Sequence, residues 1–123
     1  MIDGDAIAVF TDIKKKHSSH TLTSDIDLLE TAKTAAYFRS DGLIITGSST
    51  GHAADLEEIK LVKSNCDIPV LVGSGVTFEN VEKYLQVSDA LIVGSWFKKD
   101  GHWKSDIDPD RVKRFMDKVK RLQ

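Results

Sequence analysis

Four ionisable residues that can move protons lie close together near the start of the chain: Asp12, Lys14, Lys16 and His17. A carboxylate, ammonium groups and an imidazole at one site can act as general acid, general base or Schiff-base nucleophile. We predict that these four residues form the catalytic group, if the chain is an enzyme. The alternative, a solvated charged loop, stays open.

Small residues follow the other apolar runs of the chain and form candidate ligand-binding loops. Glycine and serine let backbone N–H groups approach a ligand closely, and parallel barrels commonly build a phosphate site after their last two strands. The alternative is that glycine serves the tight turns between strands and helices. The residues predicted to bind a small phosphorylated ligand are Thr46, Ser48, Gly73, Ser74, Gly75, Gly94 and Ser95.

Other reactive residue types indicate no clear site. His17 and His20 are a weak metal pair, because no cysteine or clear third ligand accompanies them, so we expect no metal and no cofactor. Trp96 and Trp103 are expected to pack against the protein rather than stack on a ligand. Cys66, with no neighbouring thiol, is expected to be structural.

Four strands alternating with helices must position these residues. Unbroken apolar runs, bounded by Gly, Asp or Pro, are typical of strands that are buried on both faces in parallel sheets. The predicted strands are Ala6–Phe10, Leu43–Ile45, Val70–Val72 and Leu91–Val93.

Amphipathic segments follow the strands and predict four helices. The first lies behind the capping candidates Thr23 and Ser24, and the second begins at Asp55 in a capping-box-like arrangement. The third follows Thr77, and the last opens with Asp108-Pro109. The last helix is expected to expose a basic face to solvent and to bury Val112, Phe115, Met116, Val119 and Leu122.

The order of these elements predicts an α/β fold of four βα units with parallel strands, in a single domain over residues 1–123. Ser40–Ile45 is echoed by Ser88–Val93, as repeated units of a barrel would be. A complete eight-unit barrel needs about 250 residues, so this chain supplies about half of one. Half a barrel leaves two strand edges unpaired. It can form a homo-oligomer, flatten into an open sheet, or be a truncated product, and the sequence leaves these alternatives open.

Composition narrows the class of protein. The chain has 17 Lys+Arg against 19 Asp+Glu and 41% hydrophobic residues, which is typical of a folded domain rather than a disordered chain. A net charge of −2 argues against nucleic acid as a partner. We expect no membrane span, because no apolar run approaches about 18 residues. The acidic start is unlike a targeting peptide, and the single cysteine favours a reducing compartment, so we expect the cytoplasm.

Many stretches resemble the BtpA family, in the family's order and across nearly the whole chain. They are Phe10–Ile13, Lys16–Ser18, Thr46–Ser48, Thr50-Gly51, Pro69–Thr77, Asn80-Val81, Val93–Ser95, Lys98–Trp103, Asp108-Pro109 and Arg111-Val112. The resemblance implies a TIM (β/α)8 barrel, of which this chain corresponds to the C-terminal half, with the N-terminal half missing. The family is named after a cyanobacterial protein needed for photosystem I biogenesis, and it brings no well-established reaction. Some animal relatives are labelled mitochondrial, which makes mitochondria the alternative location.

Two functions remain open from the sequence. In the first, the chain binds a small phosphorylated, sugar- or nucleotide-like ligand at the carboxyl ends of its strands. In the second, it is a non-catalytic assembly or biogenesis factor, or a degenerate paralogue, that acts through protein contacts. The clustering of glycines and ionisable groups at the predicted strand ends favours the first.

Overall fold

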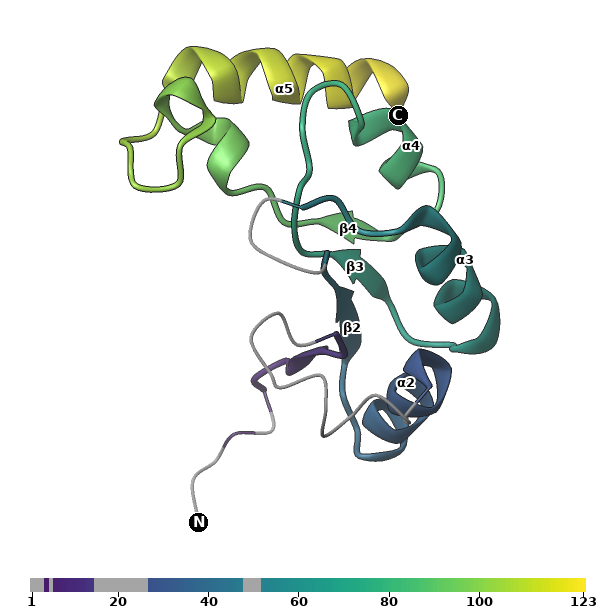
Figure 1. Cartoon of the computed structure of the whole chain (residues 1–123). Coiled ribbons are helices and arrows are strands. Elements are labelled where there is room, and N and C mark those ends of the chain that lie inside the picture. Colours follow the sequence, from purple (N-terminus) through teal and green to yellow (C-terminus); the bar gives the residue numbers. More distant parts are fainter. Residues whose placement is uncertain (1–3, 5, 15–26, 48–51) are drawn as a thin grey trace.

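The computed structural model of the chain describes residues 4, 6–14, 27–47 and 52–123 (Figure 1). Within this part, a parallel sheet of four strands has the order β1-β2-β3-β4. The strands are β1 (Phe10–Asp12), β2 (Gly42–Ile45), β3 (Val70–Val72) and β4 (Ala90–Leu91). The α-helices are α2 (Leu28–Tyr37), α3 (Leu56–Asn65), α4 (Val81–Leu85) and α5 (Pro109–Leu122), with 3-10 turns η1 (Ser95–Phe97) and η2 (Lys99–Gly101). The predicted α/β fold of four parallel βα units is confirmed, and it is consistent with half of a TIM barrel.

The core lies between the sheet and the helices that cover one of its faces. Figure 1 shows α2, α3 and α4 on the same side of the strands. Successive side chains of a strand point to opposite faces, so every second residue meets these helices. On β2 and β3 these residues are fully buried, each contributing about 1.5–3 kcal/mol of hydrophobic stabilisation. They are Leu43, Ile45, Val70 and Val72, and they belong to one cluster with Ile59, Val62 and Val81 of the helices.

The opposite face of the sheet is less covered. The strand register places Asp12, Ile44, Leu71 and Ala90 in one row across it. The same face carries Phe10, two residues before Asp12, and Ile92, two residues after Ala90. Phe10 is 44% exposed and Ile92 is 45% exposed. In the part of the chain that the structure describes, β1 and β4 each pair with a single neighbour. Within the described residues, the sheet therefore presents a mainly apolar face between two edges that have no further strand.

Aspartates begin three of the helices. Asp55 accepts from the backbone N–H groups of Glu57 and Glu58, and Asp108 accepts from the two residues that follow Pro109, as predicted from the sequence. The prediction for the first helix is wrong, because α2 begins at Leu28 with Asp27 as its cap. The capping candidates Thr23 and Ser24 lie outside the described residues.

Two predicted strands are displaced along the sequence. Val70–Val72 is confirmed as β3, whereas β1 is Phe10–Asp12 rather than Ala6–Phe10. Ile7 and Val9 are 69% and 55% exposed, because the register pairs Phe10–Asp12 with β2. The last strand is Ala90–Leu91 rather than Leu91–Val93, although Ile92 still donates its N–H to Val72 O. Apolar runs thus located the strands approximately, while pairing determined their ends.

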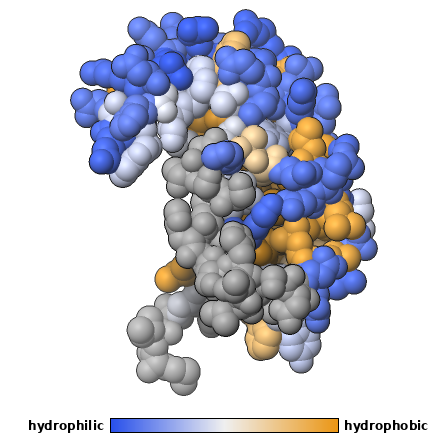
Figure 2. Space-filling view, in the orientation of Figure 1, coloured by the Kyte–Doolittle hydropathy of each residue, from blue (hydrophilic) through white to orange (hydrophobic). Residues whose placement is uncertain are grey.

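The last helix, α5, buries less than predicted. Phe115 is buried, but Met116 and Leu122 are 42% and 40% exposed, so the prediction is wrong for these two residues. The reason is that α5 packs on α4 and η1 rather than on the sheet. These contacts need only a narrow stripe of apolar side chains on α5. Figure 2 shows mainly hydrophilic residues over α5. Among the described residues, none of the helices has the length and apolar character needed to cross a membrane.

The aspartates of the echoed Ser-Asp pairs make the same hydrogen bonds in both halves of the sheet. Asp41, just before β2, accepts the N–H of Val9 on Oδ2 (2.6 Å) and donates its own N–H to Val9 O (2.7 Å). Asp89, just before β4, makes the same two bonds to Val70, at 2.8 and 2.9 Å. Each aspartate therefore fixes the start of the strand that follows it to the start of the neighbouring strand. These bonds are a structural reason for the repeated Ser-Asp sequence.

Asp89→Asn tests this strand-fixing bond. The hydrogen bond from Lys63, 2.6 Å from Oδ1, and the bond from Val70 N hold the pKa of Asp89 below its usual value. The stability gained is therefore complete above the carboxyl's unfolded-state pKa and is lost as the pH falls through its lower folded-state pKa. At pH 7 we expect the variant to lose about 1 kcal/mol of unfolding free energy, measured by urea denaturation.

Asp106→Asn is the control, because Asp106 is solvent-exposed and its contact with Lys99 is 3.9 Å long. The control should lose less than about 0.5 kcal/mol. Equal losses in both variants, or a loss at Asp89 that persists unchanged at pH 2, would contradict the role given to the Asp89 carboxylate.

Candidate functional site

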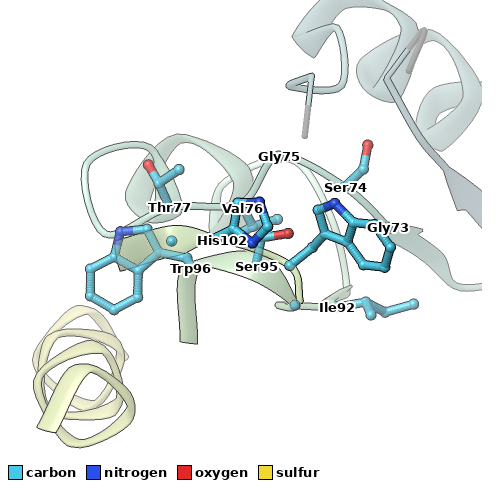
Figure 3. A pocket seen from close by; sticks show the side chains of 12 residues that line it. Gly73, Ser74, Gly75, Val76, Thr77, Ile92, Ser95, Trp96 and His102 are labelled. Atoms are coloured by element: carbon cyan, nitrogen blue, oxygen red, sulfur yellow. The ribbon is translucent and has the colours of Figure 1, made fainter. Parts of the chain in front are cut away.

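A pocket of about 500 Å³ lies at the carboxyl ends of β3 and β4. It is bounded by the loop after β3, by the segment from Ile92 to η1, and by the end of η2 (Figure 3). Its lining residues are Gly73, Ser74, Gly75, Val76, Thr77, Ile92, Gly94, Ser95, Trp96, Gly101, His102 and Trp103. The carboxyl ends of parallel strands are where α/β proteins bind ligands, and a volume of roughly 300–1,000 Å³ is usual for such sites.

Five of the seven residues predicted to bind phosphate line this one pocket. They are Gly73, Ser74, Gly75, Gly94 and Ser95. The two loops are far apart in sequence and are brought together because β3 and β4 are neighbours in the sheet. A Cβ added at Gly94 would meet no atom within 4 Å, so the backbone there borders open space.

Gly75 is required by the conformation of its loop. Its φ is +66°, and a Cβ at this position would lie 2.5 Å from Ala53 Cα. The side-chain amide of Asn80 donates to Gly75 O (2.8 Å) and accepts the N–H of Thr77 (2.7 Å), which ties the loop to the start of α4. The turn explanation and the ligand explanation therefore both apply to this glycine.

Ser74 joins two loops instead of presenting a free hydroxyl. Its Oγ accepts the N–H of Gly47 (2.7 Å) and donates to His52 O (3.0 Å), and the residue is buried. These bonds connect the loop after β3 to the loop after β2. Ser74 thus shapes the pocket wall, and both hydrogen bonds of its hydroxyl are made within the protein.

A second group of predicted residues lies at the ends of β1 and β2. Thr46 donates its hydroxyl proton to Lys14 O (2.7 Å), and Asp12 Oδ1 accepts the N–H of Lys14 (2.9 Å). The Lys14 ammonium contacts both carboxylate oxygens of Glu58, at 2.6 and 2.9 Å. Thr46 therefore lies with Asp12 and Lys14, and it is absent from the pocket lining. This ion pair restrains Lys14 in a geometry that the sequence did not indicate.

The remaining predicted residues, Lys16, His17 and Ser48, lie outside the described residues, as does His20. Among the residues that are described, no three His, Cys, Asp or Glu side chains group as metal ligands would. Cys66 packs against the core, and burial raises the pKa of its thiol, which fits the structural role predicted for it.

The sequence did not indicate that His102 and Trp103 belong to the pocket. Trp96 packs with Phe78 and Phe115 as expected, but Trp103 is 57% exposed, so the packing prediction is wrong for Trp103. The signal was present in Asp100-Gly101, a residue pair that favours turns, where φ values of 55° and 68° make a turn. That turn carries the next two residues to the pocket.

Arg111 brings positive charge to the same region. Its Nε donates to Trp96 O (2.6 Å), and its guanidinium carbon lies 4.4 Å from the centroid of the Trp96 ring. A Cβ on Gly101 would lie 3.6 Å from Arg111 Nη2. Arg111 was predicted to belong to a solvated basic face, whereas it contacts one pocket-lining residue and approaches another. A fixed cation beside the pocket favours an anionic ligand.

Comparison with known proteins places the chain among relatives that are about twice its length. The sequence profile of the BtpA family matches residues 1–121. An uncharacterized protein of Caenorhabditis elegans labelled mitochondrial is 48% identical over 117 residues, covering 95% of this chain and 42% of the relative. Uncharacterized proteins of Methanocaldococcus jannaschii and Pyrococcus abyssi are 37% and 34% identical, each over 95% of this chain and 44% of the relative. The chain thus spans less than half the length of these relatives.

Alanine substitutions distinguish a glycine that the backbone conformation requires, Gly75, from one that only borders the pocket, Gly94. We expect Gly75→Ala to lose about 2 kcal/mol or more of unfolding free energy, because the left-handed backbone and the contact with Ala53 both oppose a Cβ. Gly94→Ala should lose at least about 1 kcal/mol less, since its Cβ meets open space. Urea denaturation of both variants measures the difference, and equal losses would contradict the loop geometry.

Proposed function

This chain belongs to the BtpA family, and on that premise we propose that it binds a small phosphorylated, sugar- or nucleotide-like ligand in the pocket at the carboxyl ends of β3 and β4. The observation that carries the proposal is the convergence of Gly73–Gly75 and Gly94-Ser95 on one pocket. Such loops are where parallel barrels hold phosphate groups.

The chemistry of the wall supports an anionic group in particular. Glycines at 75 and 94 let the backbone approach a ligand without a side chain between them. Arg111 supplies positive charge next to Trp96 and Gly101. A phosphate would place its charge near this guanidinium and its oxygens against backbone N–H groups.

Proton transfer, if the family's chemistry requires it, belongs to the group at the ends of β1 and β2. Asp12 and Lys14 lie there, and we assign Lys16 and His17 to the same group because they follow within three residues of Lys14 in the sequence. Glu58 neutralises Lys14 in the structure, so Lys14 would need to leave Glu58 before it could act as a base or nucleophile. Whether the bound ligand is transformed depends on this group.

A second candidate function, assembly through protein contacts, is favoured by the uncovered sheet face. Phe10 and Ile92 lie exposed on it, between the open edges of β1 and β4. A second copy would place eight parallel strands in one closed barrel, with β4 of each copy beside β1 of the other. A separate N-terminal half of the family chain would close it in the same way.

We propose the cytoplasm as the location, with mitochondria as the alternative. The alternative is supported by the relative in Caenorhabditis elegans that is labelled mitochondrial. The sequence has one cysteine, Cys66, and it is a free thiol. A free thiol is usual in reducing compartments, and both proposed locations include one.

Ligand-induced stabilisation tests phosphate binding. With inorganic phosphate and ribose 5-phosphate as probes, we expect the unfolding free energy to rise by about 2.7 kcal/mol when the free ligand is 100 times its Kd. Gly94→Leu should abolish the rise, because its side chain projects where Gly94 borders open space. Ser64→Leu, at an exposed position on α3, is the control and should keep it. A rise that survives Gly94→Leu would contradict the site assignment.

Light scattering after size exclusion tests closure by a second copy. We expect a dimer of about twice 13.6 kDa. Phe10→Glu places a charge on the uncovered face and should give a monomer, whereas Phe38→Glu, at a 76% exposed position after α2, should leave the dimer intact. A monomeric parent chain would rule out this homodimer, and a dimer indifferent to Phe10→Glu would place its interface elsewhere.

A further inference from the structure

The pocket has an aromatic wall as well as a glycine wall. The rings of His102 and Trp103 are nearly parallel, with 21° between their planes and 6.4 Å between their centroids. Both residues line the pocket, and Figure 3 shows the imidazole of His102 among its lining side chains. Trp103 keeps 57% of its surface exposed, and the side chain that lies over its ring is that of Lys104, whose ammonium is 5.0 Å from the ring centroid. A flat ligand would stack on this ring by taking the place of the Lys104 side chain.

A small hairpin holds this wall in place. Lys98 and Ile107 form an antiparallel bridge, and Lys99 N donates to Asp106 O (3.0 Å). At the tip, Lys104 N donates to His102 Nδ1 (3.3 Å), which leaves the proton of the neutral imidazole on Nε2. The segments before and after His102 and Trp103 in the sequence are therefore joined by backbone hydrogen bonds, and these bonds hold the wall in place.

The side chains of the pocket offer few hydrogen bonds. The Ser74 hydroxyl is used by Gly47 N and His52 O, and the Thr77 hydroxyl accepts the N–H of Asn80. The side-chain groups that remain on the described lining residues are the Ser95 hydroxyl, the His102 imidazole and two indole N–H groups. A sugar ring carries several hydroxyls that each need a partner when buried, whereas a planar base can stack one face on an exposed aromatic ring and keep its polar edge in water.

Charge and size agree with a ligand that has one anionic end and one flat end. Arg111 lies by Trp96 and Gly101, and the glycine loops border the same cavity. The volume of about 500 Å³ is within the range of sites that take whole small molecules. A lone phosphate would leave the aromatic wall without a contact.

We propose that the pocket takes a nucleoside phosphate, with its base stacked on Trp103 beside His102 and its phosphate against the backbone at Gly75 and Gly94. The proposal rests on the proposed phosphate site and narrows its ligand to the nucleotide class. His102 Nε2–H donates to an acceptor on the base or the ribose. Trp103 supplies most of the preference for a nucleotide over a sugar phosphate.

Calorimetric titration with AMP, ribose 5-phosphate and inorganic phosphate tests this assignment. We expect AMP to bind at least about 10-fold more tightly than ribose 5-phosphate, as one stacked base provides. Trp103→Ala should bring the Kd of AMP to that of ribose 5-phosphate and leave the latter unchanged, while Trp103→Phe should keep most of the preference. Tyr37→Ala removes an aromatic ring that is 82% exposed on α2, away from the pocket, and is the control that should change neither.

The outcomes separate this inference from the proposed function. Equal affinities for AMP and ribose 5-phosphate, or a preference for AMP that survives Trp103→Ala, would overturn the nucleotide assignment while the phosphate site stands. No binding of any of the three probes would overturn the phosphate site, and the nucleotide assignment with it.

Discussion

The reciprocal hydrogen bonds of Asp41 and Asp89 underlie the arrangement of this molecule. Each aspartate donates its backbone N–H to the carbonyl of a valine at the start of the preceding strand or just before it, and accepts the N–H of the same valine on its carboxylate. Short parallel strands have few ladder bonds, so an extra bond at the start of a pair fixes the register. A shift by one residue would turn buried side chains such as Val70 to the uncovered face. The register also decides which residues reach the carboxyl ends of the strands.

The site follows from this register because both of its glycine loops begin where paired strands end. β3 and β4 stop together, so Gly73–Gly75 and Gly94-Ser95 meet at one edge. Ser74 then ties the first loop to the end of β2, and Asn80 ties it to α4. The positive φ of Gly75 is the local cost of this close approach to Ala53. The pocket wall is thus rigid on the side where the phosphate is proposed to bind.

Local signals in the sequence predicted the elements well, and long-range contacts explain the failures. Asp55 and Asp108 were predicted as caps because a cap bonds to residues two and three positions away. β1 was misplaced because its position is determined by pairing with β2, and the apolar residues before it give no information on that pairing. Trp103 was misjudged for the same reason. Its exposure depends on a hairpin closed by Lys98 and Ile107, a contact that the turn at Asp100-Gly101 implies but does not locate.

The binding pocket and the ionisable group occupy different parts of the chain. Every residue that lines the pocket falls within residues 73–103, in the segments that follow two adjacent strands, β3 and β4, and in the hairpin after them. Asp12 and Lys14 belong to β1 and the residues after it, and Ser74 is the contact that connects their end of the sheet to the pocket through the loop after β2. The proposed binding site therefore draws on the loops after β3 and β4 and on Arg111 of α5, whereas the proposed proton transfer would need the ends of β1 and β2 at the correct distance. Closure of the sheet into a barrel would set that distance, because curvature brings the ends of separated strands toward a common axis. On the proposed function, the ligand pocket would accordingly lie within this chain, while any proton transfer would depend on what completes the barrel.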